Sequence, residues 1–244
     1  MAERRPLVRT AVFVGGLGIV GLLTYLPVIP KLVPPGVRLP WSPLVTMAVA
    51  GLQTGFYIAV FSVVGALAAR QVGLRSPVAE AWVEGTPVGG ALRAQLLPGL
   101  ICGALGAVAA TLLSRTFIAY LTSIPTLARV FYGGFTEEVA ARWFLMSGLA
   151  WLLWRVTDGK REPARPWVML LAIAASQTLF ATAHWPIISR LTGDHPLGAV
   201  ATVFVVSLPW GWLFWKFGFE AAVLAHMSFH LFVSLLQVSA GLFR

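Results

Sequence analysis

Ionisable side chains within apolar segments are the residues of this sequence best placed to do chemistry. The chain has 244 residues, of which 58% are hydrophobic and only 11% are charged. An ionisable group inside a bilayer costs a few kcal/mol, so those that are retained there are candidates for function. They are Glu137, Glu138 and Arg142 in one apolar run, His184 in the next, and His226 and His230 in the last.

The two adjacent glutamates are expected to point in different directions. Glu138 and Arg142 are four residues apart and share a helix face, so they can neutralise each other. Glu137 points about 100° away and has no partner in its own helix. Ala140 and Ala141 follow it, and their small side chains are expected to leave a hollow for water or a substrate backbone. Glu137 is therefore a candidate functional residue, although an ion pair between helices would explain the same residues.

Three histidines could face the acidic pair. His184 follows Phe180 by four residues and Gln177 by seven, and this stripe is expected to face protein. His226 and His230 are four residues apart on one face, which suits two metal ligands or two donors aimed at one oxygen. A single histidine would more often be a hydrogen-bonded core residue. The occurrence of these histidines together with the acidic pair indicates a site.

Seven apolar runs must position these side chains. They lie at about 11–30, 43–69, 94–113, 128–154, 167–188, 197–215 and 219–241. A membrane-spanning helix needs about 20 apolar residues, and the mean hydropathy of +0.81 agrees with a bilayer environment. The predicted fold class is all-α, a polytopic transmembrane bundle of about seven helices, or eight if residues 114–127 dip into the membrane. We expect one integral membrane domain, with supporting helices and a surface loop in 1–90 and a catalytic core in 91–244.

The basic residues predict the orientation of the bundle. Most of them lie at 1–10, 70–93, 155–166 and Lys216, which would share one side of the membrane, while Arg129 counts among the fewer basic residues on the other side. The positive-inside rule then places the N-terminus inside, in a multi-pass protein of the cytoplasmic (inner) membrane. The net charge of +9 is scattered between apolar runs, so we expect the lipid bilayer as a partner and no nucleic acid.

Several other residues carry expectations about packing. Gly99 and Gly103 form a small-xxx-small pair that lets a neighbouring helix approach closely. Most tryptophans, including Trp143 and Trp210, fall near the ends of apolar runs and are expected at the membrane interface. Glu220 opens the last run, where a carboxylate complements the helix dipole. The stretch 71–93 is expected to hold either a short surface helix or a solvated loop.

The predicted helices put the candidate residues at unequal depths. His226 is seven residues from the start of the last run, about 10 Å deep, whereas Glu137 and His184 lie toward the opposite end of their runs. Because contact requires equal depth, we expect the last two helices to form a hairpin that begins inside the membrane, with Lys216 snorkelling to the surface. A helix boundary shifted by a turn or two would also reconcile them.

Three motifs in this order resemble those of a known protease family. Glu137-Glu138-x-x-x-Arg142, Phe180-x-x-x-His184 and His226-x-x-x-His230 are similar to the signatures EExxxR, FxxxH and HxxxN (or D). These belong to the CAAX-processing and bacteriocin-processing (CPBP, or Abi) intramembrane endopeptidases, which include the Ras-converting CAAX proteases. The resemblance covers roughly residues 128–240, and it departs at the last motif residue, a histidine where asparagine or aspartate is usual.

The resemblance implies an intramembrane glutamic endopeptidase. In such an enzyme Glu137, helped by His184, would activate water, and His226 and His230 would donate to the oxyanion. The supporting residues would be Glu138, Arg142 and Phe180. The implied substrate is a membrane-associated protein or peptide cut near its C-terminus or within a precursor, possibly lipidated or a C-terminal sorting tail.

Two alternatives remain open. The implied mechanism needs no cofactor, but His184, His226 and His230 could instead bind zinc, with Glu137 as the base, which makes a metalloprotease. The chain could also be a transporter or a non-catalytic binding protein whose charges line a conduction path.

A protease mechanism makes a geometric prediction. The Glu137 carboxylate should lie within about 6 Å of the His184 ring, close enough for one bridging water. His226 and His230 should line the opposite wall of the same cavity, and Glu138 should point elsewhere to meet Arg142. A separation above about 10 Å would favour the transporter instead.

Overall fold

The structure is a computed structural model that describes residues 4–33, 37, 40–157, 164–193 and 195–242, and its regular elements there are helices. In chain order they are α1 (Arg4–Tyr25), η1 (Leu26–Leu32), α2 (Pro43–Val72), α3 (Pro77–Glu84), α4 (Val88–Leu113), α5 (Arg115–Thr122), α6 (Thr126–Ala128), η2 (Arg129–Glu137), η3 (Val139–Met146), α7 (Ser147–Thr157), α8 (Pro166–Ala183), α9 (Trp185–Thr192), α10 (Leu197–Lys216) and α11 (Phe219–Leu242).

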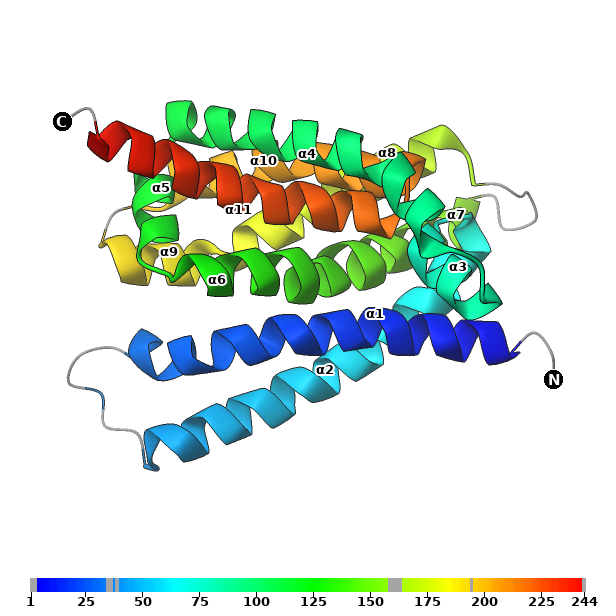
Figure 1. The fold of residues 1–244 in the computed structure, drawn as a ribbon, viewed down its shortest axis with the longest axis horizontal. Helices are drawn as coiled ribbons and strands as arrows, with labels where there is room; N and C mark the ends of the chain where they lie inside the picture. Colours follow the sequence, from blue (N-terminus) through cyan, green and yellow to red (C-terminus); the bar gives the residue numbers. More distant parts are fainter. Residues whose placement is uncertain (1–3, 34–36, 38–39, 158–163, 194, 243–244) are drawn as a thin grey trace.

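The long helices lie side by side in a bundle. In Figure 1, α1 and α2 form one edge, and α4, α10 and α11 lie across the other side of the continuous helix that holds the acidic motif. The short helices α5, α6 and α9 gather at the end near the C-terminus, whereas α3 lies at the end near the N-terminus.

Six of the described helices are long and apolar enough to cross a membrane. They are Pro6–Leu32, Pro43–Val72, Val88–Leu113, Pro166–Thr192, Leu197–Lys216 and Phe219–Ser239. These coincide with six of the seven predicted runs. The remaining run is helical without a break from Thr126 to Thr157, and it carries the ionisable residues of the acidic motif. A polytopic helical bundle of an integral membrane protein is therefore confirmed.

The segment 114–127 does not supply an eighth span. Its helix α5 has eight residues, or about 12 Å, far short of a bilayer. The Ser114 hydroxyl begins this helix by accepting a hydrogen bond from the Phe117 amide at 3.1 Å. Phe117, Tyr120 and Leu121 are buried against the bundle. This segment therefore packs on the helices as part of a wall instead of forming a separate crossing.

The acidic motif lies on an unusual helix. Both η2 and η3 are π-helical, with hydrogen bonds from each amide to the fifth carbonyl before it. A π-turn widens the helix and changes which side chains share a face. Such turns are frequent at functional sites.

Glycines on α4 let α11 approach closely, as predicted. A β-carbon on Gly99 would lie 2.7 Å from the Leu224 β-carbon. A β-carbon on Gly103 would lie 2.0 Å from the Ser228 hydroxyl and 2.5 Å from the Ala225 carbonyl. Since atoms cannot overlap in this way, any side chain at these positions would push away the helix that carries the C-terminal histidines.

The stretch 71–93 forms the predicted short helix, α3, and also secures the start of α11. The Phe219 amide donates to the Arg75 carbonyl at 3.0 Å. Glu220 accepts from the Ser76 hydroxyl and, at 3.2 Å, from the Ala79 amide. Its carboxylate therefore caps α3 in addition to standing in the first turn of its own helix. The α10–α11 connection is a tight hairpin that packs against α3. That this hairpin begins inside the membrane stays a prediction.

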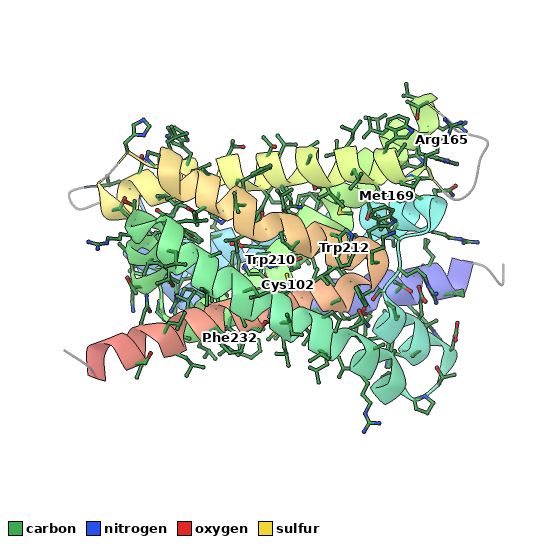
Figure 2. All side chains as sticks on the ribbon, turned by 90° about the horizontal axis from the view of Figure 1, so that it is seen from above. Cys102, Arg165, Met169, Trp210, Trp212 and Phe232 are labelled. Atoms are coloured by element: carbon green, nitrogen blue, oxygen red, sulfur yellow. The ribbon has the colours of Figure 1, made fainter. Side chains whose placement is uncertain are left out.

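The expectation that the tryptophans mark the interface is wrong for three of them. Trp143, Trp154 and Trp210 are buried. Trp143 satisfies its indole N–H by donating to the Ser62 carbonyl at 3.0 Å. Figure 2 shows Trp210 near the middle of the helices, whereas Arg165 lies at one end. Proximity to the end of an apolar run did not reveal that these rings face neighbouring helices.

Candidate active site

The candidate residues from three distant parts of the sequence meet around one pocket. Glu137, His184, His226 and His230 all line it, although they come from helix η2, the end of helix α8 and helix α11. The cavity has a volume of about 40 Å³, which is room for about three water molecules at roughly 10–15 Å³ each. Its other walls are mostly aromatic and aliphatic: Tyr25, Phe117, Tyr120, Leu121, Ile124, Arg129, Tyr132, Gly133, Phe180, Val203, Val206, Trp210 and Phe229.

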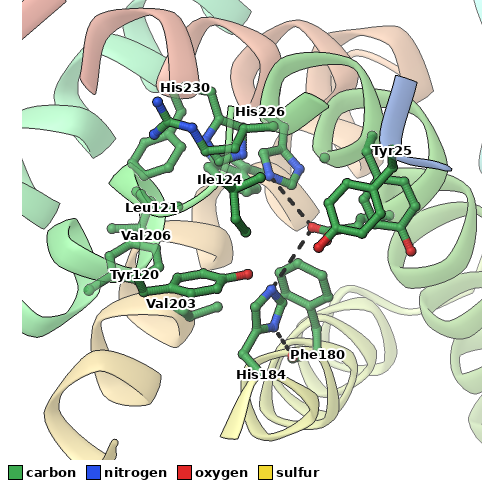
Figure 3. A pocket seen from close by; sticks show the side chains of 17 residues that line it. Tyr25, Tyr120, Leu121, Ile124, Phe180, His184, Val203, Val206, His226 and His230 are labelled. Atoms are coloured by element: carbon green, nitrogen blue, oxygen red, sulfur yellow. Dashed lines mark hydrogen bonds and ion pairs between the residues drawn. The ribbon is translucent and has the colours of Figure 1, made fainter. Parts of the chain in front are cut away.

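One carboxylate oxygen is the point of convergence. Oε2 of Glu137 lies 4.0 Å from Nε2 of His184 and 3.9 Å from Nε2 of His226, as the dashed lines in Figure 3 show. These separations are too long for direct hydrogen bonds but allow one bridging water. The predicted approach of Glu137 to His184 is therefore confirmed.

The end of α8 fixes the orientation of His184. The His184 amide bonds to the Ala181 carbonyl, which leaves the Phe180 carbonyl without its usual helical partner. Nδ1 of His184 lies 2.8 Å from that carbonyl oxygen. Because a carbonyl can only accept, Nδ1 carries the hydrogen, and a neutral ring then presents the lone pair of Nε2 to Glu137.

Glu138 orients the ring of His226 in the same way, by binding its Nδ1 atom. Nδ1 of His226 lies 2.7 Å from Oε1 of Glu138, and the ring stacks on Trp210 with centroids 4.2 Å apart. The same Oε1 also accepts from Arg142 at 2.9 Å. Glu138 thus meets Arg142 as predicted. It does not point away from the site, because it binds Nδ1 of His226 while Nε2 of the same ring faces Glu137.

Arg142 connects this pair to two further helices. Its guanidinium is completely buried and donates to Oε1 of Gln177 at 2.7 Å and to the Ser207 carbonyl at 3.2 Å. It also lies 4.8 Å from the centre of the Phe180 ring, in cation–π contact. The supporting motif residues therefore form one hydrogen-bonded network behind the pocket. Neither the Ser207 carbonyl nor Trp210 was found from the sequence, since a backbone group and an apolar ring carry no motif.

His230 and Gly133 form the wall beside His226. The two histidine rings have centroids 4.9 Å apart, and His230 is buried. A β-carbon on Gly133 would lie 2.8 Å from Nε2 of His230 and 2.9 Å from Nε2 of His226. The open space near the acid is therefore created by Gly133.

The predicted hollow at Ala140 and Ala141 is wrong. Neither alanine lines the pocket, and Ala141 is buried elsewhere. The prediction assumed α-helical geometry, in which residues three and four positions on share a face. The helices η2 and η3 are π-helical, so that geometry does not apply here, and the open space lies at Gly133.

Several pocket residues carried no signal in the sequence. Tyr25, from the region expected only to support the core, stacks on Tyr132 with centroids 4.2 Å apart. Tyr120 points its hydroxyl toward the middle of the pocket in Figure 3. Arg129, which the sequence suggested only as a charge on the outer side, has a side chain that is 6% exposed and lines the pocket.

The described residues contain no group of three His, Cys, Asp or Glu side chains placed to hold a metal ion. His184 and His226 each use Nδ1 in a hydrogen bond, so their Nε2 atoms are the ones that a metal would need. Zinc remains a prediction for experiment.

Comparisons with known proteins agree with the motifs. Residues 119–232 match the family model described as type II CAAX prenyl endopeptidase Rce1-like. The matched segment contains all the candidate catalytic and supporting residues. No curated protein and no solved structure gives a significant match to this chain.

Proposed function

Since residues 119–232 place this chain in the Rce1-like family of type II CAAX prenyl endopeptidases, and so among the peptide hydrolases, we propose that Glu137 activates the water that cuts its substrate. The substrate would be a membrane-associated peptide cleaved near its C-terminus. The observation that carries this proposal is the convergence of His184 and His226 on one oxygen of Glu137.

Glu137 is the general base in this mechanism. A water between Oε2 of Glu137 and Nε2 of His184 gives one proton to the carboxylate while its oxygen attacks the scissile carbonyl carbon. The lone pair of His184 accepts the second hydrogen of the water and so orients the attack. When the C–N bond breaks, the protonated Glu137 returns its proton to the amide nitrogen, and the products are a carboxylic acid and an amine.

His226 is the donor to the tetrahedral oxyanion. With both nitrogens protonated, its Nδ1 donates to Glu138 and its Nε2 donates into the pocket. Glu138 and Arg142 act as positioning residues. His230 is the second donor on the same wall.

The transporter alternative loses its basis in this geometry. It required ionisable groups that do not converge, whereas both Nε2 atoms lie within 4.0 Å of the carboxylate. We retain zinc as the alternative mechanism, because three histidines line one pocket. We also propose that the N-terminus lies inside, in a cytoplasmic membrane, because of the distribution of basic residues.

Replacement of the base tests the proposal. Purified protein in detergent would be given lipidated and unlipidated C-terminal peptides, including one that ends in a farnesylated CAAX sequence, and products would be identified by mass spectrometry. We expect Glu137→Gln to lower the rate by about 100-fold or more while the thermal unfolding temperature stays near that of the wild type. Equal cleavage by the variant, or no cleavage of any peptide by folded wild type, would refute the assignment.

A further inference from the structure

Arg129 is a buried cation in the pocket, and its charge has no counterion. Its side chain is 6% exposed and lines the same cavity as Glu137 and His230. Nη2 lies 3.0 Å from the hydroxyls of both Thr126 and Ser234. Nε and Nη1 have no hydrogen-bond partner, and no carboxylate pairs with this guanidinium within the part of the chain that the structure describes.

A buried guanidinium without an anion is costly. The other buried arginine of the site shows how this chain can satisfy one, since Arg142 meets a carboxylate, an amide oxygen and a carbonyl. Arg129 meets only two neutral hydroxyls and keeps the N–H groups of Nε and Nη1 unused. A cation of this kind in a peptide-cleaving pocket is suited to bind an anionic group of the substrate.

We propose that Arg129 binds the free C-terminal carboxylate of the substrate and thereby selects the bond that is cut. This inference rests on the proposed protease function. Arg129 and Glu137 are the first and last residues of the nine-residue helix η2, so they are at most about 12 Å apart along its axis. Three extended residues span about 10 Å. Both side chains line one cavity, so a carboxylate bound to Arg129 brings a peptide bond a few residues upstream to Glu137.

A purely structural role would use only Nη2, which links α6 to α11 through Thr126 and Ser234. Loss of that link would impair the cleavage of every peptide equally. A carboxylate-binding role instead predicts an effect that depends on the chemistry of the substrate terminus. The experiment therefore compares peptides that differ only at that terminus.

The test uses the full-length protein in detergent with fluorogenic peptides that end in a farnesylated cysteine, two aliphatic residues and methionine. One peptide has a C-terminal carboxylate and its twin has a carboxamide. We expect the wild type to favour the acid in kcat/KM by about tenfold to a hundredfold. Arg129→Gln should abolish the preference, so that the ratio of kcat/KM for the acid to kcat/KM for the amide falls to about one. The control Arg115→Gln, at an exposed arginine that begins α5, should keep the wild-type preference.

Arg129→Lys covers the case in which the glutamine variant does not fold. It keeps the charge and should retain part of the acid preference, with a raised KM. Equal cleavage of acid and amide by the wild type, or an equal loss for both peptides in a folded Arg129 variant, would overturn the inference. Rapid cleavage of an amidated peptide whose last residue is aspartate would also overturn it, because the pocket would then bind a side-chain carboxylate instead of the C-terminal one. A wild type that is folded but cuts no peptide would instead refute the protease function, and the inference with it.

Discussion

Glu138 accepts a hydrogen bond from Nδ1 of His226 at 2.7 Å, although the two residues are 88 positions apart in the chain. The glutamate expected to be structural thus holds a histidine expected to be catalytic. Its Oε1 also accepts from Arg142 at 2.9 Å, so the ion pair of one helix sets the orientation of a ring on another. This relationship makes the two adjacent glutamates distinguishable by experiment.

Glu138→Gln should lose both stability and activity, in contrast to Glu137→Gln. Its loss leaves Arg142 as a buried charge without a carboxylate, which costs about 3–5 kcal/mol. The amide can also present an N–H group to His226 and disturb its orientation. Thermal unfolding in detergent and kcat measure the two effects. Glu84→Gln, at an exposed position on α3, should change neither, and a Glu138 variant of wild-type stability would contradict the network.

Gly133→Ala should reduce activity more than it reduces stability. The added methyl group would lie 2.8 Å from Nε2 of His230 and 2.9 Å from Nε2 of His226, so at least one ring must move. A displacement of about 1 Å in a catalytic group can cost about 100-fold in rate. Steady-state kinetics would be compared with those of Gly148→Ala, where no atom lies within 4 Å of the new β-carbon. Wild-type kcat in Gly133→Ala would show that this space is not required.

His230→Asn should keep most of the activity if Glu137 works without a metal. Asparagine can replace a neutral imidazole as a hydrogen-bond donor, whereas it is a poor zinc ligand. The purified wild type should also contain far less than one equivalent of zinc and should resist a chelator. Zinc in stoichiometric amount, lost together with activity in His230→Asn, would establish the metalloprotease mechanism instead.

Tyr120→Phe should lower kcat by about tenfold, because the hydroxyl that points into the pocket would be lost while the buried ring remains. The measurement is kcat and KM on the farnesylated peptide. Tyr57→Phe is the matched control, since Tyr57 is an exposed tyrosine whose hydroxyl contacts Gln53 on its own helix. Equal kinetics for both variants would show that the Tyr120 hydroxyl has no part in the reaction and that the ring only packs in the pocket wall.

Properties that depend on neighbours along the chain could be predicted from the sequence. The apolar runs revealed the long helices, because a helix in lipid must satisfy its backbone internally and expose apolar side chains. The Glu138–Arg142 pair followed from the four-residue spacing, and Gly99 and Gly103 marked a close helix contact. The three motifs also predicted that Glu137 and His184 would meet, since an ionisable group in a membrane needs a polar partner.

Only the tertiary structure decided which faces turn toward the pocket. Tyr120 comes from a segment that looks like a connection in the sequence, and Arg129 stands at the start of an apolar run. The packing of α5 and η2 buries both in the site. The hollow lies at Gly133 and not at Ala140, because the pocket forms where the histidines of α11 pack against Gly133, which local sequence does not show. Apolar periodicity shows which residues share a helix face, but the rotation of each helix depends on how side chains from distant segments fit together.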